Sequence, residues 1–174
     1  MVSVLSFYLG YVPYKVTWNL QKSIVKMLKS FENFSVHCIL LLEHCPVYTI
    51  GIRHTDPMND YGEYGTKRLK RQLVAYPIIN LRCKSLQGRG LRWYVGALEE
   101  AGVKLCSQFG VTAICGGDLE TGVWLDLKHK IMAIGIRQSS SITYHGIALN
   151  CTTEPLPWLR RIVPCGLAGR DVTV

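Results

Sequence analysis

The chain has 174 residues, of which 48% are hydrophobic, and its 20 Lys and Arg outnumber its 12 Asp and Glu to give a formal net charge of +8. These values predict a single soluble globular domain over residues 1–174 with a substantial apolar core. They exclude a membrane-spanning chain, because the longest apolar stretch, residues 38–52, is too short for a bilayer and is interrupted by Glu43 and His44.

The positive charge indicates an acidic partner, which could be a nucleic acid, an anionic membrane or an acidic protein. No nucleic-acid-binding module is visible, and aromatic residues do not alternate with basic ones, so the pattern does not support a nucleic acid. The seven cysteines form no CxxC pair and no signal peptide is recognisable, which favours free thiols in a reducing compartment. The spacing of His and Cys does not fit a zinc site, so we expect no metal.

The first half of the chain predicts a strand, a helix and two further strands. Residues 2–9 are apolar and β-prone, and Pro13 suits the first turn of a helix that ends near Ser30. Residues at helical spacing predict a stripe that belongs to the core: Tyr14, Trp18, Gln21, Val25 and Leu28. Residues 36–42 and 73–81 are predicted strands, whereas 53–71 is turn-rich and expected to be irregular. His44 could contact a substrate, but a structural hydrogen bond is the favoured role.

A second amphipathic helix is predicted up to Gly110, with Leu91, Tyr94, Val95, Leu98, Gly102 and Leu105 on its apolar face. Glu99 and Glu100 lie off this stripe, so we expect both to be solvated. Residues 111–115 then predict a short strand. The glycine turn at 116–118 is not a phosphate loop, because neither Lys-Ser/Thr nor a helix start follows it.

Residues 121–125 and 131–136 are β-branched or aromatic runs separated by charged residues, which predicts a hairpin. Lys130 then lies where the turn becomes a strand. The following strand alternates, so small residues leave one face almost bare, namely Ala133 and Gly135, while larger ones fill the other face, namely Met132, Ile134 and Ile136.

Residues 145–150 repeat this alternation, with Gly146 and Ala148 as the small residues. A bare strand face admits a slim ligand such as a linear acyl chain, or it allows a sheet and a helix to pack closely. The pattern alone favours close packing. Strands joined by short turns outnumber helices, so the predicted fold class is α+β, a mixed, mainly antiparallel sheet with packed helices.

Cys165 lies between Pro164 and Gly166 in a segment without apolar periodicity, which makes it a candidate nucleophile. A nucleophilic cysteine needs a lowered pKa, and a nearby ammonium such as that of Lys130 would favour the thiolate.

Three motifs occur in order: Lys-Ile-x-Ala-Ile-Gly-x-Arg from Lys130, His-Gly-x-Ala-Leu-Asn from His145, and Pro-Cys-Gly-Leu-x-Gly around Cys165. Together they resemble the octanoyltransferases of lipoate biosynthesis, also called lipoyl(octanoyl) transferases. Segments at 9–21, 43–51 and 72–77 extend the resemblance over nearly the whole chain. Details near residues 142–165 are similar to the animal, mitochondrial branch.

The resemblance implies a biotin/lipoate protein ligase-like fold and a thioester-to-amide transfer that needs neither metal nor nucleotide cofactor. An octanoyl group would pass from the phosphopantetheine thiol of acyl carrier protein to Cys165, with Lys130 as base or charge partner, and then to a lysine of a lipoyl domain. The substrate-binding residues implied in this way are Ala133, Ile134, Gly135, His145, Gly146, Ile147, Ala148 and Asn150.

The implied partners are acyl carrier protein and the lipoyl domains of glycine cleavage H protein and of 2-oxo acid dehydrogenase E2 subunits. The implied location is the mitochondrion. Neither a nucleic acid nor a membrane is expected as a partner.

The sequence departs from the family pattern in places. Where the family has Arg-Gly-Gly-x-x-Thr-(Tyr/Phe)-His-Gly-Pro-Gly-Gln, this chain reads Gly65-Thr66-Lys67-Arg68-Leu69-Lys70-Arg71-Gln72, so that only Gln72 remains. The chain ends nine residues after Cys165, where the family continues into a helical segment, so we expect a C-terminally truncated domain. Lys128 is a rival to Lys130, which is preferred because it directly precedes Ile131.

These departures define an alternative to an active enzyme. Because the glycine-rich motif shapes the wall of the acyl tunnel in the family, the alternative is a catalytically impaired variant that at most binds acyl carrier protein or lipoyl domains. A lipoate or biotin ligase of the same fold is disfavoured, because it would need an ATP-binding loop and does not favour a catalytic cysteine.

Overall fold

The computed structural model describes residues 3–30, 36–45, 47, 72–117, 120–159 and 171–174. Within these residues the strands are β1 (Ser3–Val12), β2 (Val36–His44), β3 (Gln72–Asn80), β4 (Ile114–Cys115), β5 (Val123–Trp124), β6 (His129–Ser139), β7 (Ile142–Asn150) and β8 (Asp171–Val172). The helices are α1 (Tyr14–Lys29), α2 (Leu91–Gln108) and α3 (Leu156–Leu159), with a 3-10 turn η1 (Lys84–Leu86).

The described strands form one sheet in the order β1-β2-β3-β7-β6-β5-β4, with β8 paired to β6 beside this path. β1 and β2 are parallel and joined through α1, and β6 and β8 are also parallel. All other neighbours pair antiparallel. The predicted α+β class with a mixed, mainly antiparallel sheet is therefore confirmed.

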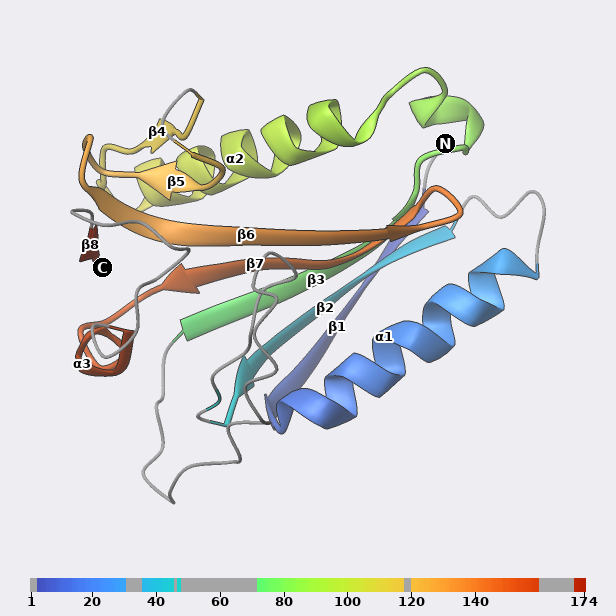
Figure 1. Ribbon diagram of the computed structural model, residues 1–174, viewed down its shortest axis with the longest axis horizontal. Coiled ribbons are helices and arrows are strands. Elements are labelled where there is room, and N and C mark those ends of the chain that lie inside the picture. Colours follow the sequence, from blue (N-terminus) through green and yellow to red (C-terminus); the bar gives the residue numbers. More distant parts are fainter. Residues whose placement is uncertain (1–2, 31–35, 46, 48–71, 118–119, 160–170) are drawn as a thin grey trace, which may run out of the picture.

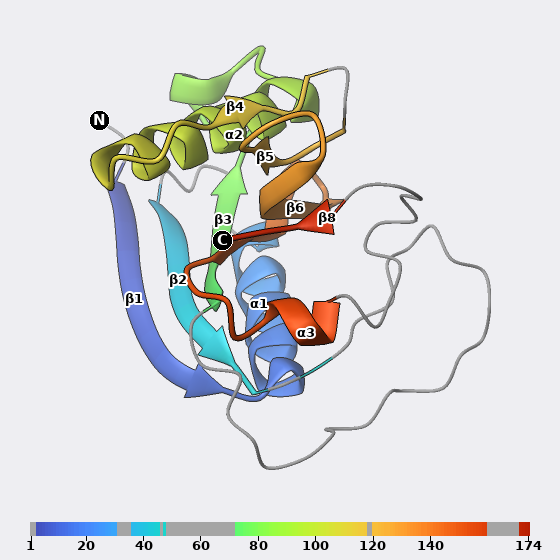
Figure 2. The same cartoon turned by 90° about the vertical axis from the view of Figure 1, so that its left-hand side faces the viewer.

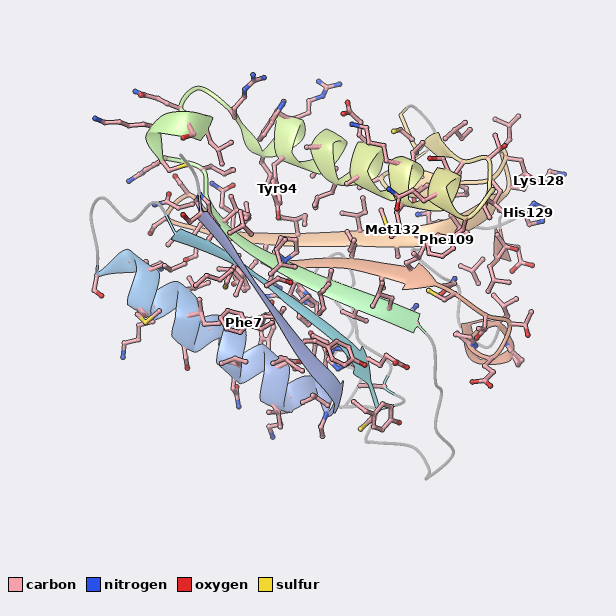
Figure 3. All side chains as sticks on the ribbon, turned by 180° about the vertical axis from the view of Figure 1, so that it is seen from behind. Phe7, Tyr94, Phe109, Lys128, His129 and Met132 are labelled. Carbon is pink, nitrogen blue, oxygen red and sulfur yellow. The ribbon has the colours of Figure 1, made fainter. Side chains whose placement is uncertain are left out.

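The two long helices cover opposite faces of the sheet (Figures 1 and 2). Under α1 lies a core cluster of Val25 and Leu28 with side chains of β2, β3 and β7. Under α2 lies a second cluster, which includes Cys106, Met132 and Leu149. Figure 3 shows the side chains of Tyr94 and Met132 between α2 and the sheet. The two faces of β6 and β7 therefore belong to different environments.

The first helix agrees with its prediction to within one residue at each end. It buries Gln21, Val25 and Leu28 as expected, and also Thr17; Gln21 and Thr17 are completely inaccessible to solvent. A fully buried glutamine needs a partner, because burying an unpaired amide costs free energy. Gln21 Oε1 accepts a hydrogen bond from the backbone N–H of His145 in β7, over 2.8 Å. The helix is thus joined to the sheet by a polar contact within its apolar face.

The second helix corrects two predictions, the first being that Leu91 lies on its apolar face, because Leu91 is 38% exposed. Glu99 was expected on a solvated face, but its side chain is only 8% exposed and its Oε1 accepts a hydrogen bond from the backbone N–H of Gly122, 2.8 Å away. Glu100 is exposed as predicted. The helix lies close to β6, because a Cβ at Gly102 would overlap the side chain of Met132. This close approach rotates the buried face relative to the predicted stripe and brings Glu99 inward.

Three smaller outcomes concern strand lengths, thiols and membrane crossing. The strand predicted over 111–115 is confined to β4, whereas β6 and β7 are longer than predicted. The six described cysteines are free, as expected: Cys38, Cys45, Cys83, Cys106, Cys115 and Cys151. No described helix is both long enough and apolar enough to cross a bilayer.

Candidate active site

The hairpin of β6 and β7 carries most of the predicted site residues. Its strands pair over eight positions, from Met132 with Leu149 to Ser139 with Ile142. The turn places Ser140 at φ 51° and Ser141 at φ 67°, and two successive left-handed residues match the right-handed twist of the flanking strands. The register puts Ala133 opposite Ala148 and Gly135 opposite Gly146.

These small residues form two adjacent pairs across the hairpin. Ala148 packs against the cluster under α1, so this face of β7 is turned toward α1. Ile134 and Ile147, which the resemblance also assigned to the site, pair with each other and pack in the cluster under α2. The structure therefore separates the predicted lining residues into a small-residue face and a packed apolar face.

The two glycines of this face differ in their surroundings. A Cβ at Gly146 would overlap the carbonyl oxygen of Ala75 in β3 and would lie 2.7 Å from Cδ of Pro77. Gly146 is therefore required by the close approach of a neighbouring strand. Gly135 is exposed, and no described atom lies within 4 Å of the position its Cβ would take. Gly146 is thus explained by the close approach of a neighbouring strand, whereas the space beside Gly135 is open.

His145 interrupts the regular alternation of β7. It adopts φ 65°, a left-handed value that is uncommon for a residue other than glycine. As a result the rings of His145 and Tyr144 lie on the same face of the sheet. Trp18 of α1 contacts both, with its ring centroid 5.3 Å from that of His145 and 5.9 Å from that of Tyr144. The N–H of His145 donates to Oε1 of Gln21, over 2.8 Å.

The ring of His145 is part of an aromatic and histidine cluster beneath the first turn of α1. Its Nε2 lies 3.2 Å from the hydroxyl of Tyr14. His44 bonds the carbonyl of Val12 through Nδ1 at 2.8 Å and the hydroxyl of Tyr76 through Nε2 at 2.6 Å. The structural role favoured for His44 is therefore confirmed.

Arg137 is a charged neighbour of this cluster. Burial, together with the positive charges of Arg137 and His44, lowers the pKa of His145 to about 4, and burial also lowers the pKa of His44. Burial raises the pKa of Tyr76. Arg137 stacks on Trp18, with its guanidinium carbon 4.8 Å from the ring centroid. Both histidines are therefore neutral near pH 7 and act as hydrogen-bonding groups.

Lys130 occupies the other end of β6 and is 5% exposed. Its Nζ donates to the carbonyl oxygen of Thr121 at 3.1 Å and lies 3.4 Å from Oε2 of Glu120. The same Nζ lies 4.6 Å from the ring centroid of Trp124, a favourable arrangement of a cation over an aromatic face. The buried ammonium is thus held by a carbonyl, a carboxylate and an indole.

Lys128, the rival candidate, is exposed in the turn before β6. Figure 3 shows Lys128 and His129 at the outer end of the sheet. The carboxylate of Asp126 accepts from the backbone N–H of Lys128 at 2.7 Å and contacts His129 Nδ1 at the same distance. The hydrogen bond from His129 and those from the backbone lower the pKa of Asp126 to about 2. Of the two candidate lysines, Lys130 is thus buried among polar partners and Lys128 is exposed.

Asn150 joins three segments at the end of β7. Its side chain is 5% exposed, its Oδ1 accepts from Nε2 of Gln72 at 2.9 Å, and its Nδ2 donates to the carbonyl oxygen of Thr173 at 2.8 Å. Gln72 is the first residue of β3, and Thr173 directly follows β8. Both polar groups of Asn150 are therefore engaged by the protein.

β8 runs alongside the start of β6 and pairs Val172 with Lys130. The N–H of Thr173 also donates to the carbonyl oxygen of Lys130, over 2.9 Å. Cys165 lies outside the described residues, six positions before Asp171. The departure from the glycine-rich motif at 65–71 and the predicted irregular segment at 53–71 lie outside them as well.

Two residues of this region were missed by reasoning from the sequence. Glu99 was placed on the solvent side of its helix, and Gln21 was assigned to a core stripe without a polar role. For Gln21 a signal existed, because a glutamine at a core position of a helix has to find a partner. In the described part of the chain no group of three or more His, Cys, Asp and Glu side chains is arranged to hold a metal ion.

Comparison with a protein-family model and with curated proteins gives a consistent result. The model described as the lipoyl protein ligase A/B catalytic domain matches residues 69–173. A mitochondrial octanoyl-[acyl-carrier-protein]:protein N-octanoyltransferase of Danio rerio is 36% identical over 191 aligned residues, covering 98% of this chain and 80% of that protein.

Two further relatives come from other lineages. A chloroplastic octanoyltransferase of Arabidopsis thaliana is 38% identical, covering 92% of this chain and 62% of that protein. An octanoyltransferase of the bacterium Acidothermus cellulolyticus is 39% identical, covering 94% of this chain and 77% of that protein. The relatives thus include mitochondrial, chloroplastic and bacterial proteins.

Proposed function

The chain belongs to the octanoyltransferase family that has the lipoyl protein ligase A/B catalytic domain, and on this basis we propose that it transfers an octanoyl group from acyl carrier protein to a lysine of a lipoyl domain. The observation that carries the proposal is the similarity to the Danio rerio enzyme, because it extends over 98% of this chain. An enzyme of this kind is an acyltransferase of lipoate biosynthesis.

We propose Cys165 as the nucleophile and Lys130 as its charge partner. In the first half-reaction the thiolate attacks the octanoyl thioester, a new C–S bond forms at Cys165, and the phosphopantetheine thiolate leaves and takes up a proton. In the second, the amine of the lipoyl-domain lysine attacks the Cys165 thioester. An amide forms, the thiolate of Cys165 is released, and the proton lost by the attacking amine passes to solvent or to a base.

Support for Lys130 comes from its position and its contacts. Its ammonium is buried, its backbone pairs with β8, and β8 begins six residues after Cys165 in the sequence. An ammonium close to a cysteine favours the thiolate form and hence nucleophilic attack.

For the acyl chain we propose the face formed by Ala133, Gly135 and Ala148. Gly135 supports this path, because it is exposed and open where a side chain would stand. Gly146 contributes by allowing β3 to approach, and His145 by orienting the backbone before it. Asn150 acts by holding Gln72 and Thr173, whereas Ile134 and Ile147 support the hairpin from the opposite face.

Finer assignments rest on the motifs alone. We propose membership of the animal, mitochondrial branch, a mitochondrial location, and lipoyl domains of glycine cleavage H protein and of 2-oxo acid dehydrogenase E2 subunits as acceptors. The sequence at residues 65–71 supports the proposal that this form lacks the glycine-rich wall of its relatives.

Intact-protein mass spectrometry after incubation with octanoyl acyl carrier protein tests the proposal. A single octanoyl adduct that disappears in Cys165→Ser is the expected result. If folded parent protein acquires no adduct, the chain is instead the catalytically impaired variant, which at most binds acyl carrier protein or lipoyl domains.

A further inference from the structure

Glu99 is a buried acidic side chain that the proposed chemistry does not use. It projects from the middle of α2, is 8% exposed, and accepts the backbone N–H of Gly122 at 2.8 Å. Removing a carboxylate from water is costly unless hydrogen bonds replace its solvation. The contact with Gly122 therefore matters to the loop that it reaches.

That loop, residues 120–122, lies directly against Lys130. The carbonyl of Thr121 accepts the hydrogen bond from Nζ of Lys130, and the N–H of the same peptide group, that of Gly122, donates to Glu99. A Cβ at Gly122 would lie 3.2 Å from Cε and 3.3 Å from Cδ of Lys130. The loop thus contacts both the head and the stem of the lysine.

Other contacts fix the loop within its own part of the sheet. The carbonyl of Gly122 accepts from the N–H of Gly116 at 2.8 Å, and the carbonyl of Glu120 accepts from Nε1 of Trp124 at 3.0 Å. Glu99 adds a bond from a different layer, because α2 packs over β6. A displacement of the loop would also move the carbonyl of Thr121, which accepts the hydrogen bond from the Lys130 ammonium.

We propose that Glu99 is a positioning residue for Lys130, acting through the N–H of Gly122 and the carbonyl of Thr121. This inference rests on the proposed function, in which Lys130 is the charge partner of the nucleophile. In this role Glu99 acts through Lys130 and does not itself take part in the reaction.

Four variants test the proposal. Glu99→Gln keeps an oxygen that can accept from Gly122, and Glu99→Met removes it at similar side-chain length. Glu99→Asp keeps the charge but withdraws the acceptor by one methylene, and it provides a second variant if Glu99→Met does not fold. Glu100→Met, on the exposed face one position along, is the matched control.

The readouts are the rate of octanoyl adduct formation under single-turnover conditions, kcat and KM for octanoyl acyl carrier protein, the pH dependence of alkylation at Cys165, and the melting temperature. We expect Glu99→Met and Glu99→Asp to lower kcat by about 10- to 100-fold with little change in KM, because small misplacements of a catalytic group cost factors of this order. The alkylation profile should shift to higher pH. Glu99→Gln should keep kcat and the alkylation profile close to those of the parent.

The outcomes separate the two proposals. A parent that forms no adduct overturns the proposed function and this inference with it. A parent that forms the adduct, alongside folded Glu99→Met and Glu99→Asp with unchanged kcat and alkylation profile, overturns the role of Glu99 alone. A lower melting temperature with unchanged kcat also overturns it, because Glu99 would then be structural only.

Discussion

Nδ2 of Asn150 donates to the carbonyl oxygen of Thr173 over 2.8 Å, while its Oδ1 accepts from Gln72 over 2.9 Å. One side chain thus ties the end of β7 to the start of β3 and to the residue after β8. The proposed nucleophile precedes β8 by six residues in the sequence. The bond to Thr173 therefore anchors the chain just beyond the nucleophile.

Asn150→Asp should separate these two hydrogen bonds. The carboxylate can still accept from Gln72 but cannot donate to Thr173, so we expect a loss of about 1–3 kcal/mol in the free energy of unfolding. Octanoyl adduct formation should slow as well. Urea unfolding and intact mass kinetics measure the two effects, with Asn19→Asp on the exposed side of α1 as control. An unchanged unfolding midpoint would show that the Thr173 contact does not anchor the segment.

Lys130→Met should abolish most of the acyl transfer, whereas Lys128→Met should not. Methionine keeps an apolar stem beside Trp124 but removes the ammonium proposed to favour the thiolate, and loss of one electrostatic stabilising group costs about 10²- to 10³-fold in rate. Because Lys128 is exposed, its replacement should leave the rate within about 3-fold, a free-energy change below about 0.7 kcal/mol. Equal loss in both variants would contradict the preference for Lys130.

Gly146→Ala and Gly135→Ala should differ in their effects on stability. The first places a Cβ against the carbonyl of Ala75, so we expect destabilisation by about 1–3 kcal/mol, as in other overpacked sites. The second meets no described atom and should leave the unfolding midpoint nearly unchanged. Thermal unfolding monitored by circular dichroism compares the two.

Gly135→Val tests the proposed acyl path on the same open face. A branched side chain at this position would occupy the space proposed for the octanoyl group, so adduct formation should fall although the protein remains folded. Transfer at the parent's rate by folded Gly135→Val would mean that the acyl chain lies elsewhere.

The stability of the protein should decline as the pH falls from about 6.5 toward 4. The folded pKa of His145 is about 4, below its ordinary value of 6.5, so the unfolded state binds the proton more readily. The stabilisation is therefore complete above pH 6.5 and is lost as the pH approaches 4. For this group alone the loss amounts to about 2 kcal/mol at pH 5. His44 contributes in the same direction.

Urea unfolding at pH 7.5 and pH 5 measures this decline in the parent and in His145→Gln. The glutamine variant cannot become cationic, so its stability should depend less on pH. The same slope in parent and variant would assign the pH dependence to other groups.

The sequence was a good guide to elements with strong periodicity. Apolar spacing around Val25 and Leu28 located α1, and the alternation through Met132 and Ile134 located β6, because those patterns reflect burial on one face. The same alternation correctly separated Ala133 and Gly135 from Ile134. Strand β4 was predicted too long, since a short apolar run does not reveal how many residues find a partner strand.

Non-local geometry explains what the sequence could not supply. Glutamate is typical of a solvated helix face, so the sequence does not indicate that Glu99 is buried. Its burial accompanies the close approach of α2 to β6 at Gly102. The left-handed backbone of His145 has no sequence signal, because that conformation usually indicates glycine. Its N–H is bonded to Gln21 of α1, which lies 124 positions away in the sequence.

The turn at Ser140 and Ser141 has a consequence for how the site is assembled. A connection of two residues brings β6 and β7 together with little loss of chain entropy, and such hairpins form within about 1–10 μs. The pairing of β7 with β3, in contrast, joins residues as far apart as Gln72 and Asn150. We therefore expect Gly135 and Gly146 to face each other early in folding, before the rest of the sheet closes around them. The face proposed for the acyl chain would then form by local pairing of β6 with β7, and the slower pairing of β7 with β3 would follow.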